Sequence, residues 1–447
     1  MVLINEMNIY ALSSGRGPSG IAIIRLSGKD ALEISATISK KKNLKIKKIN
    51  FCKFYNPLDN SIIDEGLLLL FPSPNSYTGD NLVEFHIHGG NAVISYFLSV
   101  LSEQKNCRLA EPGEFTKIAF QNNKFDLVEA ESIGDLIQSE TELQRQQAVK
   151  LAQGNASHYY NNLREKLIES LAYVEAQIDF AEDDLPHNVL KKVQSSIKEV
   201  HEDIKKILND NKVGEKIRAG FRVAIIGEAN AGKSSLLNLL SKRDAAIVSE
   251  EVGTTRDIIE TYLNIDGYPV ILADTAGIRE AKNEVEKKGI VLALSKSKEA
   301  DLNLIVIDNS SKTINNKIKD LINKDSIVLL NKSDIKGNHN HKFDADTILV
   351  SVKKNKNIDQ FIKKLKEKLS KKFTSNKSVI VTRERHRVKL HACMKEIDKF
   401  LEKDQNKDIE LAAEDLRMAT RHLGSIVGKV DVEEILGSIF KDFCIGK

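Results

Sequence analysis

The stretch Gly227-Glu228-Ala229-Asn230-Ala231-Gly232-Lys233-Ser234 lies in the middle of a chain of 447 residues and decides its fold. It matches the phosphate-loop pattern G-x-x-x-x-G-K-[ST]. The apolar run before it, residues 221–226, predicts a buried parallel strand, and residues 235–240 after it predict the opening of a helix. A strand, a glycine-rich turn and a helix N-terminus direct backbone N–H groups and the positive end of a helix dipole at one point. The stretch therefore predicts a binding site for a phosphate chain.

Length and composition limit the class of protein. A chain of this length predicts about two to four domains, and an apolar content of 41% is sufficient for their cores. A run of eighteen or more apolar residues is absent from the sequence, so we expect no membrane span. The first ten residues lack the basic flank and apolar core of a secretory signal. The net charge of +4 neither indicates nor excludes nucleic-acid binding. We expect a cytoplasmic protein.

The four cysteines, Cys52, Cys107, Cys393 and Cys444, are scattered without C-x-x-C spacing. They predict neither a disulfide framework nor a zinc site. Cys444 is followed by Ile-Gly-Lys, which does not match a prenylation box. The simplest interpretation of Cys444 is a partly buried small side chain.

Changes along the chain in the pattern of apolar and turn-forming residues predict three modules. Residues 1–118 contain short β-rich runs separated by Gly- and Pro-rich turns, which predicts an α+β domain. Residues 119–217 and 376–447 show apolar positions at helical spacing, so they predict one discontinuous all-α domain. Residues 218–375, which contain the phosphate loop, form an α/β domain inserted into it. The predicted strands of the first module are 20–26, 67–71 and 82–88, and the predicted helical stretches are 127–174, 189–208, 379–400 and 409–423.

The inserted domain contains the other parts of a guanine-nucleotide site in the expected order. Gly253-Thr254-Thr255-Arg256-Asp257 follows the phosphate loop at switch-loop distance, and a predicted hairpin with an Asp266-Gly267 turn ends in Asp274-Thr275-Ala276-Gly277. Two predicted strands, 303–308 and 327–330, come next, and the second is followed by Asn331-Lys332-Ser333-Asp334. A last strand, 347–350, ends in Ser351-Val352-Lys353. Four motifs, each closing a predicted strand, predict a P-loop GTPase fold.

Each motif has a chemical role. Lys233 and the loop N–H groups bind the β- and γ-phosphates, Ser234 and Thr255 are the expected Mg²⁺ ligands, and Asp274 holds a metal-bound water. Asp334 accepts hydrogen bonds from N1–H and N2–H₂ of guanine, a pair that adenine lacks, so the site selects GTP. The Lys332 stem covers the base and Asn331 joins the loops. The full set of predicted nucleotide contacts is Asn230, Ala231, Gly232, Lys233, Ser234, Ser235, Ser249, Thr254, Thr255, Asp274, Thr275, Ala276, Gly277, Asn331, Lys332, Asp334, Ser351, Val352 and Lys353.

Ile278 follows Asp274-Thr275-Ala276-Gly277 at the position where small GTPases of the Ras type carry a water-orienting glutamine. An isoleucine cannot orient water. Hydrolysis therefore requires another water-positioning group and another source of positive charge.

Two further features allow alternative interpretations. His86 and His88 alternate on one strand face with Glu84, which is either a metal pair or a set of ordinary hydrogen-bonding residues. The lysine runs 40–48 and 363–372, together with residues 383–387, either contact RNA phosphates or form solvated surface.

The chain resembles the MnmE (TrmE) family of tRNA-modification GTPases over its whole length. In the first module the resemblance rests on motifs such as Ile24-Arg25-Leu26-Ser27-Gly28, Tyr77-Thr78-Gly79-Asp80 and Asn123-Lys124-Phe125-Asp126-Leu127. In the inserted domain it rests on the motifs above, and at the end of the chain on Phe443-Cys444-Ile445-Gly446-Lys447.

The resemblance implies a site in each outer part of the chain. The N-terminal domain would be folate-binding and similar to aminomethyltransferases, would make the homodimer, and would bind 5,10-methylene- or 5-formyl-tetrahydrofolate through Arg25, Glu84, Lys124 and Lys447. The G domains would dimerise across a K⁺ ion bound by Asn230, Ser249, Glu251 and Thr254. Glu286 would be the catalytic carboxylate that orients water, together with Lys233, although from the residues alone Glu284 is as plausible. Cys444 becomes a candidate nucleophile.

The implied function is GTP hydrolysis coupled to tRNA modification. With an FAD-containing MnmG-type partner, in a heterotetramer, the protein would add an aminomethyl-type (carboxymethylaminomethyl) group to C5 of the wobble uridine of certain tRNAs. One alternative is a regulatory GTPase switch in ribosome or RNA assembly without its own modification chemistry. Another is a folate-dependent methyltransferase with a regulatory G domain. Ala229, at a position where the family commonly has proline, and the acidic pair Glu250-Glu251 in the K⁺ loop depart from the family pattern.

Overall fold

The computed structural model describes residues 7–15, 17–179, 189–243, 260–274, 297–311, 313–335, 343–373, 379–404, 408–430, 436, 439–440 and 443–446. Contacts divide the chain into two compact units. Unit 1 comprises Met1–Gly134, Ser157–Arg164 and Leu423–Lys447, and unit 2 comprises Asp135–Ala156 and Glu165–His422. In the described part of the chain, no helix is both long and apolar enough to span a bilayer. The three-module division with its boundaries stays a prediction.

Unit 1 is built on a six-stranded sheet in the order β3-β4-β5-β2-β1-β6. Its strands are β1 (Asn8–Leu12), β2 (Ser19–Ser27), β3 (Asn50–Tyr55), β4 (Ile62–Phe71), β5 (Leu82–Gly89) and β6 (Cys107–Leu109). All neighbours are antiparallel except β1 and β6. The three strands predicted for this part of the chain are confirmed as β2, β4 and β5.

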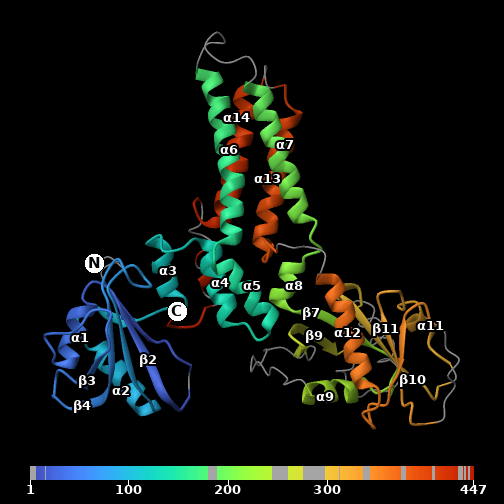
Figure 1. Cartoon of the computed structure of the whole chain (residues 1–447), viewed down its shortest axis with the longest axis horizontal. Coiled ribbons are helices and arrows are strands. Elements are labelled where there is room, and N and C mark those ends of the chain that lie inside the picture. The colour runs from blue at the N-terminus through green and yellow to red at the C-terminus, as the bar shows by residue number, and fades with distance from the viewer. Residues whose placement is uncertain are drawn as a thin grey trace, which may run out of the picture. The chain divides into compact units, whose positions relative to one another are not determined.

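One face of this sheet is covered by two helices, and on the other face Ile9, Ala11 and Leu82 pack against Phe115 of α3 (Glu114–Gln121). Apolar residues on alternate positions of the strands pack against α1 (Ala31–Ser39) and α2 (Asn91–Ser102), which lie beside the sheet in Figure 1. The intervening positions form the outer face, where Arg25 lies opposite Glu84 and Ile23 lies opposite His86. The period of two that buries one face therefore places charged side chains together on the other.

A segment near the end of the chain completes unit 1. Leu436, Phe440 and Phe443 share a core with Leu127 and Ala130 of α4 (Leu127–Ile137), next to α3 (Glu114–Gln121).

The segment continues along the sheet. Ile445 forms a β-bridge with Pro112, the Gly113 N–H donates to the Cys444 carbonyl over 3.4 Å, and Ser13 Oγ donates to the Gly446 carbonyl over 2.9 Å. Gly446 has φ of +94°, and a Cβ there would lie 2.3 Å from the Leu12 carbonyl oxygen. Only glycine fits this contact without displacing the backbone.

The helical stretch predicted for residues 127–174 consists of three helices in the structure. The prediction that it is continuous is therefore wrong. After α4 come α5 (Glu142–Ala152) and α6 (Asn155–Asp179). Thr141 caps α5 through a reciprocal capping box with Gln144. Gly154, with φ of 80°, ends the turn before α6. Apolar spacing continues across both breaks, which is why periodicity alone did not reveal them.

The other predicted helices are present. The structure confirms α7 (Val189–Leu208) at its predicted bounds and α14 (Ile409–Val427) with a later end. The predicted start of the helix at residue 379 is wrong, because α13 (Glu384–Glu402) begins five residues later. Residues 380–382 are buried without helical structure, and the Val381 carbonyl packs so closely on Gly214 that a Cβ there would lie 2.2 Å away.

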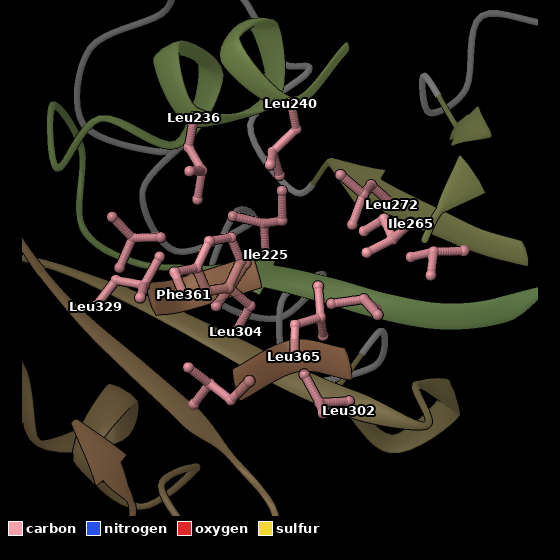
Figure 2. Packing of buried hydrophobic residues seen from close by; sticks show 14 of the residues in the cluster. Ile225, Leu236, Leu240, Ile265, Leu272, Leu302, Leu304, Leu329, Phe361 and Leu365 are labelled. Carbon is pink, nitrogen blue, oxygen red and sulfur yellow. The ribbon is translucent and has the colours of Figure 1, made fainter. Parts of the chain in front are cut away.

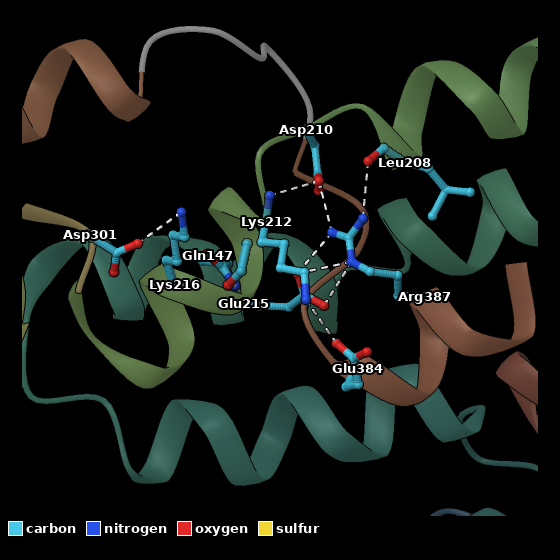
Figure 3. A network of polar contacts seen from close by, with 10 residues as sticks. Gln147, Leu208, Asp210, Lys212, Glu215, Lys216, Asp301, Glu384 and Arg387 are labelled. Carbon is cyan, nitrogen blue, oxygen red and sulfur yellow. Dashed lines mark hydrogen bonds and ion pairs between the residues drawn. The ribbon is translucent and has the colours of Figure 1, made fainter. Parts of the chain in front are cut away.

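A short helix that the sequence analysis did not predict, α8 (Val213–Ala219), joins the helices of unit 2 to its sheet. Figure 3 shows Arg387 reaching from α13 toward Asp210 and Glu215, which its guanidinium contacts at 2.7 and 2.8 Å. Arg387 also donates to the Leu208 carbonyl. Lys216, the next residue of α8 after Glu215, pairs with Asp301 at 2.9 Å. A buried set of ion pairs at Arg387 and a half-exposed one at Lys216 therefore hold this connection.

The inserted domain has a six-stranded sheet in the order β12-β11-β10-β7-β9-β8, parallel except for β8. Its strands are β7 (Phe221–Ile226), β8 (Glu260–Ile265), β9 (Tyr268–Asp274), β10 (Leu302–Asp308), β11 (Ile327–Asn331) and β12 (Asp346–Leu349). The six strands and the Asp266-Gly267 turn confirm the predicted elements of this domain, and its helices are α9 (Lys233–Arg243), α11 (Asn316–Lys319) and α12 (Ile358–Phe373).

The sheet of the inserted domain is buried on both faces. Figure 2 shows Leu236 and Leu240 pointing from α9 toward Ile225, in a cluster that includes Phe361 of α12. The alternate residues of the same strands, among them Ile226, join a second cluster with α11. Because the parallel strands end at one edge, the loops that follow β7, β10, β11 and β12 meet there.

Candidate functional site

The phosphate loop lies between β7 and α9, as predicted. The Lys233 ammonium donates to the carbonyls of Gly227 and Glu228 at 2.9 and 2.8 Å, which holds it over the loop. Gly232 has φ of +101°, and a Cβ there would lie 2.2 Å from Nδ2 of Asn331. The loop can therefore close around a phosphate only with glycine at this position.

The other polar side chains at the phosphate loop affect its charge and its accessibility to a ligand. Asn230 has φ of 60°, a backbone conformation that asparagine tolerates well, and it is exposed. Glu228 accepts a hydrogen bond from the Asn315 N–H at 2.8 Å, so its carboxylate is held by the segment before α11. Ser234 and Ser235 are exposed in the first turn of α9.

Asn331, at the end of β11, joins the phosphate loop to the loop after β12. Its side chain is 3% exposed, donates from Nδ2 to the Ala231 carbonyl at 2.8 Å, and accepts from the Val352 N–H at 3.1 Å. This is the connection between loops that the sequence predicts for Asn331. It places the phosphate-binding and base-binding parts in one rigid frame.

Asp334 is positioned as an acceptor at the same edge of the sheet. Ser351 Oγ donates to its carboxylate at 2.6 Å. This bond and the residue's own backbone N–H lower the pKa of Asp334, so the carboxylate is charged at neutral pH. The Lys354 N–H bonds the same Ser351 hydroxyl at 3.2 Å and fixes its orientation. The arrangement fits a ligand edge with adjacent N–H donors, which guanine has.

Asp308 is a site residue that the sequence analysis missed. It ends β10, and its carboxylate lies 2.6 Å from the Lys332 ammonium. Burial opposes ionisation of Asp308, but the bonds from Lys332 and Ser310 outweigh it, and the net effect lowers its pKa. Lys332 has φ of 62°, so backbone and ion pair together direct its stem. The signal for Asp308 in the sequence is that a carboxylate residue ends a run of buried apolar residues.

The structure thus brings together Asn230–Ser235, Asn331–Asp334 and Ser351–Lys353, three of the predicted motifs. The backbone of Asp274 ends β9 beside β7, in register with Ile225. The remaining predicted residues of the nucleotide and metal sites lie outside the described residues: Ser249, Glu251, Thr254, Thr255, Thr275, Ala276, Gly277, Glu284 and Glu286.

A second cluster of predicted residues lies on the outer face of the sheet in unit 1. Arg25 Nε donates to Glu84 Oε1 at 2.8 Å, and both side chains are mostly buried. The Arg25 guanidinium also lies 5.5 Å from the centre of the Tyr77 ring. His86 Nε2 lies 3.5 Å from the other oxygen of Glu84. A cation, a carboxylate and an aromatic ring therefore face one another.

The aromatic members of this cluster were not predicted. Tyr77 contacts Phe125 with ring centres 5.9 Å apart, and its hydroxyl bonds to Thr116 at 2.8 Å. Burial raises the pKa of Tyr77, which stays a neutral phenol. Lys124, next to Phe125, is exposed and donates to the Pro74 carbonyl. Lys447, the fourth predicted residue of this set, lies outside the described residues.

The metal interpretation of the two histidines gains no support. His88 bonds to Asp64 instead, and no group of three His, Cys, Asp or Glu side chains in the described part of the chain could hold a metal ion. Cys444 is exposed, so the expectation of a partly buried side chain is wrong, because only its backbone takes part in the contacts with Gly113.

Comparisons with known proteins cover both halves of the chain. The family described as the GTP-binding protein TrmE N-terminus matches residues 8–124, and the MnmE helical domain matches residues 127–444. A tRNA modification GTPase MnmE of Pelagibacter ubique (strain HTCC1062) is 54% identical over 448 residues, 99% of this chain and 100% of that protein. Proteins of the same name from Rickettsia bellii (strain RML369-C) and Parvibaculum lavamentivorans are 42% and 41% identical, each over 98% of this chain and 99% of the relative.

Proposed function

The chain belongs to the MnmE family of tRNA modification GTPases and is a GTP hydrolase acting in tRNA modification, and from this premise we propose the reaction it serves. With an FAD-dependent MnmG-type partner in a heterotetramer, it adds an aminomethyl-type (carboxymethylaminomethyl) group to C5 of the wobble uridine of certain tRNAs. This modification of tRNA takes place in the cytoplasm. GTP hydrolysis drives opening and closing of paired G domains.

The observation that carries the nucleotide part is the frame around Asn331. A buried amide holds the phosphate loop and the Val352 backbone together, while Ser351 holds Asp334 ready to accept from guanine. A ligand that lacked the two guanine donors would form no hydrogen bonds with this carboxylate, which would keep Ser351 as its partner, so that ligand would bind more weakly. The geometry therefore supports selection of GTP over ATP.

The proposed catalytic roles extend this frame. Lys233 would turn from the loop carbonyls to the β- and γ-phosphates. Ser234 and Thr255 would hold Mg²⁺, and Asp274 would hold a water bound to that ion. Glu286 orients the attacking water. It takes the role of the glutamine that Ras-type GTPases have at the position of Ile278. Asn230, Ser249, Glu251 and Thr254 would hold a K⁺ ion, which would supply positive charge where two G domains meet. The exposed Asn230 amide, held at positive φ, supports this role with a hard oxygen ligand.

The outer-face cluster of unit 1 is the proposed folate site. Tetrahydrofolate, as the 5,10-methylene or 5-formyl derivative, supplies the one-carbon unit when bound. Glu84 accepts from the pterin N–H groups, Tyr77 and Phe125 provide an aromatic wall, and Arg25, Lys124 and Lys447 bind the glutamate carboxylates. The N-terminal module also makes the homodimer. Cys444 keeps its proposed role as a nucleophile, and its exposure supports access to a substrate.

Nucleoside analysis of tRNA from cells that lack the protein tests the reaction. We expect wobble uridines without the C5 substituent, and an unchanged nucleoside profile would refute the proposal. For the mechanism, we expect GTP hydrolysis to be much faster in KCl than in NaCl. Glu286→Ala should bind GTP but lose turnover, and a near-normal rate would remove Glu286 from its role.

A further inference from the structure

A strongly basic segment of unit 1 is not used by either candidate site. Residues 34–58 contain seven lysines, all between positions 40 and 53, and no Asp or Glu. The whole chain has 67 basic and 63 acidic residues, a net charge of +4, so without these seven lysines the remainder has 60 and 63, a net charge of −3. The positive balance of the protein is therefore concentrated in one segment that runs from the end of α1 into β3.

Six of the seven lysines lie in residues 40–49, which we call the lysine loop, and the seventh, Lys53, lies in β3. The lysine loop is held in a defined conformation. Asn50, at the start of β3, is 8% exposed and accepts from the Lys45 N–H at 2.8 Å. Its amide nitrogen lies 2.9 to 3.2 Å from the carbonyls of Lys45, Lys48 and Leu68. The Lys47 N–H donates to the Leu70 carbonyl at 3.0 Å. All these bonds involve the backbone of the loop, so its side chains stay available.

The lysine side chains project into solvent and are not neutralised. All seven are exposed. Lys40 lies over the Tyr55 ring and Lys41 bonds to the Phe51 carbonyl, which orients two of them. Within the described ranges no carboxylate forms an ion pair with any of the seven. The cations of this dense group repel one another, so binding of a polyanion to them is favourable.

Exposed apolar side chains lie among the lysines. Ile46, Ile49 and Phe51 are 57%, 66% and 61% exposed. Phe51 stands on the outer face of the edge strand β3, opposite Leu67. Lysines around an exposed aromatic ring are the combination that binds unpaired nucleotides, since the phosphates meet the cations and a base stacks on the ring. An acidic peptide would not need the ring. An anionic membrane could also take these apolar side chains, and RNA is favoured over it because the chain belongs to a family of tRNA modification GTPases.

We propose that the lysine loop, with Phe51, is an RNA-binding surface that contacts tRNA phosphates and stacks an unpaired base. The choice of tRNA rests on the proposed function, while the choice of a nucleic acid rests on the charge, order and exposure of the loop. A second copy of the chain is a poorer occupant, because it would bring another seven lysines against this one.

The test compares two variants with the same change in charge. Lys45→Gln/Lys47→Gln/Lys48→Gln removes three loop cations without touching their backbone bonds, and Lys191→Gln/Lys192→Gln/Lys198→Gln removes three exposed cations of α7. Affinity of the full-length protein for fluorescently labelled total tRNA is measured by anisotropy between about 50 and 200 mM KCl. The slope of log K against log salt should fall by about two to three for the loop variant, and its affinity should fall at least about tenfold. The control should match wild type, and GTP hydrolysis without tRNA should be unchanged in both.

Each result decides the proposal. Equal losses in the two variants would mean a general charge effect and would overturn it, as would wild-type affinity in the loop variant. A change in the molecular mass of the protein in sedimentation, with tRNA binding intact, would assign the loop to a second copy instead. The nucleoside analysis is independent: if tRNA binding depends on the loop but cells without the protein keep normal wobble uridines, the surface stands and the proposed function falls.

Discussion

Asn331→Ala tests whether the two loops of the nucleotide site act as one frame. The substitution removes both hydrogen bonds of a side chain that is 3% exposed, one to the Ala231 carbonyl and one from the Val352 N–H. The strands and the packing of the domain are left in place. The amide that occupies the space beside Gly232 also disappears, so the phosphate loop loses its neighbour.

The magnitude follows from the two groups left behind. A buried donor or acceptor that loses its partner costs about 1–3 kcal/mol, so the pair costs about 2–6 kcal/mol before any water enters. Nucleotide binding must then order both loops. If about 1.4 kcal/mol of this ordering cost falls on the binding step, the affinity for the nucleotide falls about tenfold. We expect a lower melting temperature of the G domain and a fluorescent GDP analogue bound at least about tenfold more weakly.

The assay takes advantage of the composition, since the chain has no tryptophan and the fluorescent nucleotide is read against a low background. Thermal unfolding is followed with and without saturating GDP, because a protein of several domains does not unfold in one step. Asn316→Ala, an exposed asparagine at the start of α11, is the matched control and should change neither quantity. Wild-type nucleotide affinity in Asn331→Ala would refute the view that this amide couples the loops.

Three further predictions concern other parts of the chain. Gly446→Ala places a methyl group 2.3 Å from the Leu12 carbonyl, so the C-terminal segment should detach and become sensitive to carboxypeptidase, and continued resistance would contradict the contact. With a thiol reagent at pH 8, the exposed Cys444 should react first. Burial and a nearby carboxylate raise the pKa of Cys107 to about 11, so less of it is thiolate at pH 8, and its labelling rate should rise about tenfold per unit between pH 8 and 10. Arg387→Leu leaves two carboxylates without their cation and should destabilise unit 2 by about 3–5 kcal/mol in calorimetry, whereas a change below about 1 kcal/mol would show that solvent reaches them.

Patterns within one element were predictable from the sequence, and contacts between distant segments were not. The bounds of β7 and α7 agree with prediction because each is a single uninterrupted apolar pattern. The start of α13 was misplaced since residues 380–382 are buried by packing on Gly214, and burial imitates the apolar spacing of a helix. The breaks on either side of α5 depend on one cap and one glycine.

The candidate site divides in the same way. Asn331 and Asp334 belong to a motif whose spacing carries their chemistry, so their placement was predictable. Asp308 and Tyr77 act through partners that are far away in sequence, Lys332 and Arg25, and no local pattern indicates such pairs. The match of Arg25 to Glu84 followed only from the family resemblance, and the strand register explains it.

The C-terminal segment packed into unit 1 has a consequence for the order of folding during synthesis. The core shared by Leu127, Ala130 and Phe443 joins residues more than 300 positions apart, whereas the main core of the inserted domain runs from Phe221 to Leu369. At roughly 5–20 residues per second, the ribosome needs about 15–60 s to make the intervening chain. The inserted domain can therefore finish folding first. Unit 1, whose N-terminal part is synthesised earliest, is the last to complete its core. During that interval its apolar surface is open to chaperones and to wrong partners.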